Sequence, residues 1–146
     1  MFDTIPTLRD GETLIREFVP DRGTYIREHI ILAALGSVIT TVFLMATGNP
    51  YPWVGPVAAV AAIAVRGLYV ASEQLNMHWL LTDQRMIGPD GRSIPLSQIK
   101  KARGLFSAAQ LITNSGDKYM LKYLRDTKSA VDAINNAVIQ HRQPAK

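Results

Sequence analysis

The side chains that could carry out chemistry are few and lie far apart along the chain. The histidines are His29, His78 and His141, and no two of them have the spacing of a metal-binding pair. The chain contains no cysteine, which excludes disulfides, thiolate metal sites and cysteine nucleophiles. No serine lies in a nucleophile motif, and no glycine-rich phosphate loop or pair of catalytic carboxylates is recognisable. We therefore expect a protein that is not an enzyme and that carries no metal and no cofactor.

One enzymatic hypothesis stays open, and it depends on where two particular side chains meet. His78 and Asp83 could act together only if the fold brings them into one pocket. Asp83, Asp90 and Asp117 all stand in turn-forming sequences, where an aspartate commonly bonds to nearby backbone groups. The ordinary role of a turn residue is therefore the competing explanation for these carboxylates.

Five basic residues form a candidate binding surface. Lys100, Lys101 and Arg103 are close in sequence, and Lys118 and Lys122 fall on what we expect to be a neighbouring strand. They could contact anionic lipid headgroups, at about 1 kcal/mol for each basic residue near the surface. The alternative is a solvated sheet edge that its charges keep soluble. Nucleic acid is not an expected partner, because no aromatic residue lies among Lys100, Lys101 and Arg103 and because we expect the chain to be anchored in a membrane.

The charges of the whole chain are strongly segregated. No Asp, Glu, Lys or Arg occurs from Ile30 to Val65, whereas the rest of the chain carries all 16 basic and 12 acidic residues. This division indicates two solvents, lipid and water. Residues 72–146 hold eleven basic and six acidic residues, a net charge of +5. Such an excess suits a domain lying near anionic lipid, although an ordinary solvated surface would also account for it.

Two apolar runs, residues 29–48 and 53–72, predict a transmembrane helical hairpin. The 19 uncharged residues from Ile30 to Gly48 would make roughly 28 Å of helix, close to the thickness of a hydrocarbon core. A signal peptide does not fit, because an acidic segment precedes the run. Prolines between the runs force a turn. Tyr51 and Trp53 lie at this turn, as expected of aromatic anchors at a membrane–water interface.

The basic residues also predict the orientation of this hairpin. The turn between the runs has no Lys or Arg, whereas Arg16, Arg22 and Arg27 precede the first run and Arg85 and Arg92 follow the second. Basic residues are retained on the cytoplasmic side. We therefore expect a multi-pass protein of the bacterial inner membrane with both termini in the cytoplasm.

Arg66 is the one charged residue within the second apolar run. It lies 12 residues beyond Val54, roughly 18 Å along a helix. Its guanidinium either extends to the lipid phosphates or binds a specific partner. That partner would be Glu28, Glu73 or an acidic site on another membrane protein.

The chain after the second run predicts a small antiparallel sheet closed by a helix. Short apolar strands alternate with turn sequences at 88–91 and 114–117. We count five or six strands there, with a further candidate in 12–18. Residues 125–143 predict an amphipathic helix, capped by Asp126 or Thr127, whose Val131, Ile134 and Val138 cover the sheet.

The order of these elements resembles the bacterial pleckstrin-homology-like domain family. The resemblance is carried by Trp79, by Leu81-Thr82-Asp83-Gln84-Arg85 and by Ile94-Pro95-Leu96-Ser97-Gln98-Ile99. In that family a membrane hairpin is often followed by one such domain. The resemblance implies an α+β membrane protein with a pleckstrin-homology-like sheet or barrel, complete at seven strands and capped by a C-terminal helix. It also implies an interaction scaffold, without implying that phosphoinositides are bound.

We therefore expect an N-terminal cytoplasmic segment over 1–28, a hairpin over 29–72 and a cytoplasmic pleckstrin-homology-like domain over 73–146. The leading hypothesis is a non-enzymatic, membrane-anchored interaction or scaffold protein. The alternative is an accessory subunit or assembly factor of a larger respiratory or photosynthetic membrane complex. The expected partners are the lipid bilayer and another membrane protein or complex, and a homo-oligomer is compatible with the sequence.

Overall fold

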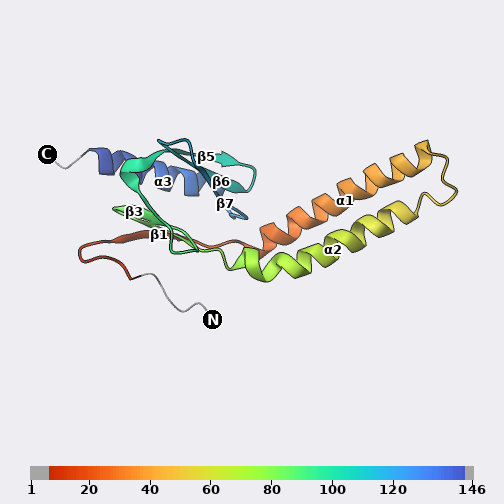
Figure 1. Cartoon of the computed structure of the whole chain (residues 1–146), viewed down its shortest axis with the longest axis horizontal. Coiled ribbons are helices and arrows are strands. Elements are labelled where there is room, and N and C mark those ends of the chain that lie inside the picture. Colours follow the sequence, from red (N-terminus) through yellow and green to blue (C-terminus); the bar gives the residue numbers. More distant parts are fainter. Residues whose placement is uncertain (1–6, 144–146) are drawn as a thin grey trace. The chain divides into compact units, whose positions relative to one another are not determined.

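The computed structural model describes residues 7–143 and divides into two compact units. The first unit, which we call the sheet domain, joins the described residues up to Asp21 with the chain from Leu75 onward. The second, the helical hairpin, covers Arg22–Gln74 (Figure 1). This division differs from the expected one, which set residues 1–28 apart as a separate segment. The reason is that residues before Asp21 form a strand of the sheet domain.

Two long helices lie in the chain between the first two strands of one sheet. The sheet domain also contains a short 3-10 helix, Leu96–Gln98. The helices and strands, in chain order, are β1 (Leu14–Phe18), α1 (Arg22–Ala46), α2 (Val54–Leu75), β2 (Trp79–Thr82), β3 (Arg85–Ile87), β4 (Ser93–Pro95), β5 (Ile99–Leu105), β6 (Ala108–Thr113), β7 (Lys118–Leu121) and α3 (Thr127–Arg142).

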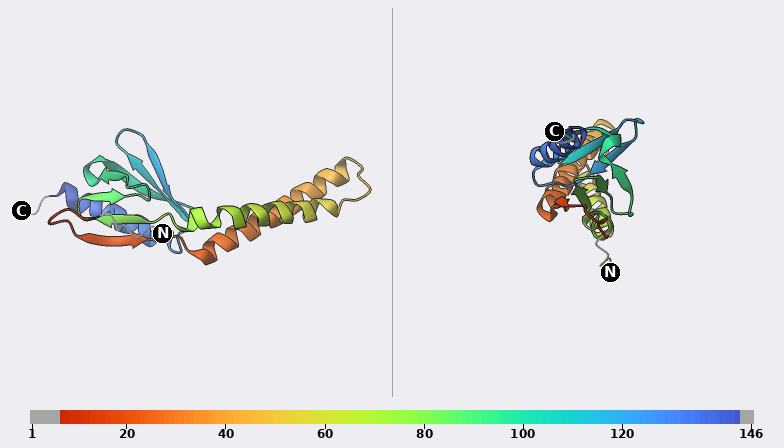
Figure 2. Two further views of the ribbon diagram at one scale, coloured as in Figure 1. Left: turned by 60° about the horizontal axis from the view of Figure 1, so that its bottom comes forward. Right: turned by 90° about the vertical axis from the view of Figure 1, so that its left-hand side faces the viewer.

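Seven strands form two antiparallel sheets within the described residues, one ordered β1-β2-β3-β4 and the other β5-β6-β7 (Figure 2). The α+β class is confirmed, and the candidate strand in 12–18 is confirmed as β1. Phe18 of β1 pairs with Trp79 of β2. The helical hairpin is therefore inserted between two neighbouring, hydrogen-bonded strands. The sequence predicts five or six strands after the second apolar run, and the described residues contain six there, β2 to β7.

Glycines make the predicted reversals possible. Gly91 in the β3–β4 turn has φ 70° and Gly116 in the β6–β7 turn has φ 95°, values that glycine adopts without steric cost. The Gly88 N–H donates to the Arg92 carbonyl at 2.7 Å and closes the first of these turns.

Helix α3 packs on β5 and β6 through its apolar face, as its spacing predicts. Asp126 is the N-cap, and its carboxylate accepts a hydrogen bond from the Ser129 N–H at 2.9 Å. Ile134 and Val138 are buried in the core. The Asn135 side chain donates to the Ala102 carbonyl at 3.0 Å and accepts from its N–H at 2.8 Å, which pins the helix to β5.

Both helices of the hairpin are long and apolar enough to cross a membrane. Compared with the predicted runs 29–48 and 53–72, α1 begins earlier, at Arg22, and α2 ends later, at Leu75, because the polar turns there are helical as well. At the connecting turn α1 already ends at Ala46 and α2 begins at Val54. Small residues allow the two backbones to approach closely. A Cβ placed on Gly55 would lie 2.9 Å from the Thr40 Oγ1, and one on Gly36 would lie 3.4 Å from the Ala59 Cβ.

Candidate functional site

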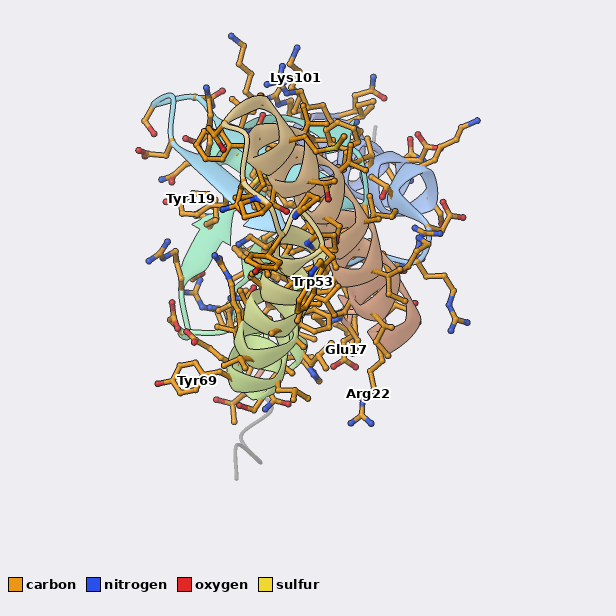
Figure 3. All side chains as sticks on the ribbon, turned by 90° about the vertical axis from the view of Figure 1, so that its right-hand side faces the viewer. Glu17, Arg22, Trp53, Tyr69, Lys101 and Tyr119 are labelled. Carbon is orange, nitrogen blue, oxygen red and sulfur yellow. The ribbon has the colours of Figure 1, made fainter. Side chains whose placement is uncertain are left out.

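Most of the predicted basic residues share one face of the β5-β6-β7 sheet. Lys101 lies opposite Ile112, and Ile112 lies opposite Lys118 on the next strand. Arg103 lies two residues along β5, opposite Gln110. Because cross-strand partners point to the same side of a sheet, these basic side chains project from one face. Figure 3 shows the Lys101 side chain pointing outward.

The remaining two basic residues of the prediction have different settings. Lys100 occupies an irregularity of β5, between the pairs formed by Ile99 and Lys101, and is exposed. Lys122 is also exposed and directly follows β7, at the end of the sheet where β5 ends. Within this set, the structure gives a fixed partner to Arg103, whose Nε donates to the Gln110 Oε1 at 2.7 Å. The four lysines of the set are available to an anionic partner.

Two apolar residues at the tip of the β5–β6 hairpin are exposed, and the sequence did not identify them as a candidate site. Leu105 is 42% exposed and Phe106 is 97% exposed, and Phe106 has φ 55°. Since an aromatic residue rarely adopts a positive φ, this turn carries a strain of order 1 kcal/mol. Asn, Asp or Gly would suit the position better. That mismatch, visible in the letters "GLFSA", is the signal that could have identified the tip.

Hydrogen bonds hold this tip against the segment that precedes α3. The Leu124 N–H donates to the Ser107 carbonyl at 2.8 Å, and the Thr127 Oγ1 donates to the Phe106 carbonyl at 3.1 Å. The preceding residue, Tyr123, contacts Asp21, which is the last residue of the sheet domain before α1. The Tyr123 carbonyl accepts from the Asp21 N–H at 2.7 Å, and Arg125 pairs with the Asp21 carboxylate at 2.9 Å.

A second polar cluster fastens the segment before β1 to the β2–β3 turn. The Glu12 side chain is fully shielded from solvent and Arg85 is 13% exposed. Arg85 donates to both carboxylate oxygens of Glu12, at 2.8 and 3.0 Å, and the Thr82 Oγ1 donates at 2.7 Å. Hydrogen bonds from Arg85 in particular lower the pKa of Glu12 from 4.5 to about 2. The same bonds raise the pKa of Arg85.

The residues predicted to act in the membrane are exposed. Tyr51 and Trp53 lie in the turn between α1 and α2, 61% and 64% exposed, and Figure 3 labels Trp53. Arg66 is exposed on α2. In the described part of the chain it forms no ion pair with Glu28 or Glu73, the two carboxylates proposed as its partners.

The structure keeps the candidate chemical residues apart. His78 precedes β2 and lies 3.0 Å from Glu17, whereas Asp83 follows β2 and accepts from the Thr13 N–H at 2.9 Å. The strand between them spans about 13 Å. The convergence of His78 and Asp83 that an enzymatic site required is therefore absent from the described residues.

His29 packs against Tyr25, with ring centroids 4.1 Å apart, and His141 lies in the last turn of α3. Residues 7–143 contain no group of three or more His, Asp or Glu side chains that could hold a metal ion.

No family model, curated protein or solved structure matches the chain.

Proposed function

We propose that this chain is a membrane-anchored, non-enzymatic interaction protein that presents a pleckstrin-homology-like domain at the cytoplasmic face of a bacterial inner membrane. The observation that carries the proposal is the pairing of Phe18 with Trp79 across the inserted helices. Two hydrogen-bonded strands of one sheet must lie on the same side of a membrane. The chain between them therefore crosses an even number of times, and its two helices that are long and apolar enough to cross a membrane meet that condition with one crossing each.

The charge distribution supports the cytoplasmic side for the sheet domain. Arg22 and Arg27 are exposed at the start of α1, and the turn between the helices contains no Lys or Arg. Basic residues are retained in the cytoplasm, so the turn would face outward.

The strand arrangement supports a pleckstrin-homology-like domain. Sheets of four and three strands with a closing helix, over the described residues, have the seven strands that the resemblance implies. The exposed lysines Lys101 and Lys118 on one sheet face offer a surface for an acidic partner. Such a face suits binding of an acidic partner.

Membrane fractionation combined with reporter fusions tests the proposal. We expect the full chain to remain in the pellet after carbonate extraction and to be released by detergent. Alkaline phosphatase inserted after Asn49 should be active, and the same enzyme fused after Lys146 should be inactive. A carbonate-soluble chain, or an active phosphatase at the C-terminal fusion, would contradict the proposed anchoring and topology.

One observation favours the second candidate, an accessory subunit or assembly factor of a larger membrane complex. Arg66 is exposed within an apolar helix and lacks an ion-pair partner in the described chain. An acid on another membrane protein would pair with a charge in that setting, which otherwise extends to the lipid phosphates. After mild detergent extraction and a native gel, we expect co-migration with a complex that Arg66→Leu abolishes. The matched variant Arg27→Leu, outside the apolar stretch, should retain it.

A further inference from the structure

We propose that the Leu105–Phe106 tip of the β5–β6 hairpin inserts into the headgroup–acyl boundary of the bilayer that the helical hairpin enters. This inference rests on the proposed membrane anchoring and adds a second, separate lipid contact made by the sheet domain. It concerns Phe106 first, because this side chain is 97% exposed and its backbone is held at φ 55°. The Phe106 side chain therefore buries almost no apolar surface against the described part of the chain.

The hydrogen bonds place the tip at the end of the sheet domain from which the chain departs. The Ser107 carbonyl binds the Leu124 N–H, and the neighbouring Tyr123 carbonyl binds the Asp21 N–H. The path from Ser107 to Leu124, on to Tyr123 and then to Asp21 consists of two hydrogen-bonded backbone separations of about 4.8 Å and one residue step of about 3.8 Å. Ser107 therefore lies within about 13 Å of Asp21. Helix α1 begins at the next residue, Arg22. The tip is thus tied to the last residue of the sheet domain before α1.

The length of the polar start of α1 agrees with a tip at headgroup depth. The charge-free run begins at Ile30, eight residues after Arg22, which is about 12 Å along a helix. The headgroup and interfacial layer on one side of a bilayer is about 5–8 Å thick, so an upright α1 would hold Asp21 about 5 Å outside it. The tip, tied to the chain within about 13 Å of Asp21, is within reach of that layer, which aromatic side chains favour.

The charges around the tip favour lipid as the occupant. Lys122 and Arg125 flank the segment that binds Ser107, and Lys128 follows Thr127, which binds Phe106; all three are exposed. Asp21 neutralises Arg125 in an ion pair, and the Asp126 carboxylate caps α3 through the Ser129 N–H. Lys122 and Lys128 form no ion pair within the described residues. An apolar tip with these two cations beside it matches the acyl boundary beneath anionic headgroups.

The absence of cysteine permits a direct measurement of depth. Single nitroxide labels would be attached at Phe106→Cys, at Ser115→Cys in the β6–β7 turn at the other end of β6, and at Val42→Cys in the charge-free part of α1. The full chain would be reconstituted in vesicles of zwitterionic and anionic phosphatidylglycerol lipids. Collision rates with oxygen, which concentrates in lipid, and with a water-soluble nickel chelate would then be compared by electron paramagnetic resonance.

We expect the oxygen-to-nickel collision ratio at Phe106→Cys to be at least threefold higher than at Ser115→Cys and lower than at Val42→Cys. A label at Phe106→Cys as water-exposed as that at Ser115→Cys would overturn the inference, while a lipid-exposed Val42→Cys label would leave the anchoring intact. A water-exposed Val42→Cys label would instead overturn the anchoring. If the Phe106→Cys label were shielded in native membranes but not in vesicles, a protein rather than lipid would cover the tip.

A second pair of variants carries the label on the neighbouring residue and differs only at Phe106. A label at Leu105→Cys should show intermediate depth, and adding Phe106→Ser should shift its collision ratio toward that of Ser115→Cys. An unchanged ratio would count against Phe106 as the inserting residue. Unchanged mobility of the Ser115→Cys label in the Phe106→Ser background controls for the fold of the sheet domain.

Discussion

Glu12 illustrates how a single buried carboxylate can hold a distant segment in place. Its two oxygens accept two hydrogen bonds from Arg85 and one from Thr82, and the Arg9 N–H donates at 2.8 Å. A shielded charge is costly unless it is paired and hydrogen-bonded, and this one has both kinds of compensation. The cluster fixes the residues before β1 to the β2–β3 turn, 70 positions away.

Acid should weaken the sheet domain through this residue. The folded-state pKa of Glu12, about 2, lies below the ordinary value of 4.5, so the unfolded chain takes up the proton first. The stabilisation is therefore complete above about pH 4.5 and is lost as the pH falls toward 2. In detergent, the free energy of unfolding measured by Trp79 fluorescence in a Trp53→Phe background should decline over this window.

Glu12→Gln should flatten that decline and lower the stability at pH 7 by about 3 kcal/mol, because it leaves Arg85 without its buried counter-charge. Glu17→Gln is the matched control, since Glu17 is a half-exposed acid on β1 and this variant, which retains Glu12, should still show the decline. An equally steep decline in Glu12→Gln would show that other groups cause the acid sensitivity.

At the scale of elements, β1 is the strand whose contribution most needs testing, because 60 residues separate its last residue from the first paired position of β2. Phe18 is 4% exposed and belongs to the core, whereas Ile15 on the same strand is 46% exposed. Phe18→Ala should cost about 3 kcal/mol of sheet-domain stability. Ile15→Ala should cost about 0.5 kcal/mol or less. Similar small effects from both would mean that β1 does not belong to the core.

The packing of α1 against α2 can be tested by cross-linking. A Cβ on Gly36 lies 3.4 Å from the Ala59 Cβ, close to the separation within a disulfide. Gly36→Cys with Ala59→Cys should therefore form an intramolecular disulfide upon oxidation, so that fragments cut at a protease site placed in the turn stay linked. Gly36→Cys with Ala58→Cys is the matched control and should separate. Equal linkage in both pairs would contradict the helix packing.

At the scale of the whole molecule, the chain is a sheet domain interrupted by a hairpin. The strands on either side of the insertion are hydrogen-bonded to each other, so the domain has a short gap to close once the helices are removed. Replacing residues 22–74 by a short Gly-Ser linker should give a domain that stays in a detergent-free supernatant and unfolds cooperatively by circular dichroism. The same replacement combined with Phe18→Asp should not fold. Aggregation of the unmodified linker variant would mean that the sheet domain depends on the helices.

The sequence by itself determined the parts whose physical basis is local. Charge-free runs mark α1 and α2, and turn residues such as Gly91 and Gly116 mark the hairpins. The spacing of Ile134 and Val138 marks the buried face of α3. These features depend on neighbours a few positions away, so they can be recognised in a linear pattern.

Only the tertiary structure decided which distant segments meet. The pairing of Phe18 with Trp79, the ion pair of Glu12 with Arg85 and the bonds that link Ser107 to Leu124 all join residues far apart in the chain. Periodicity reveals that a face is apolar but not what packs on it, because contacts at long range depend on how the whole chain folds. For the same reason the sequence marked Lys101 and Lys118 as candidates, while their shared face and the exposed Phe106 tip emerged only from the register of β5, β6 and β7.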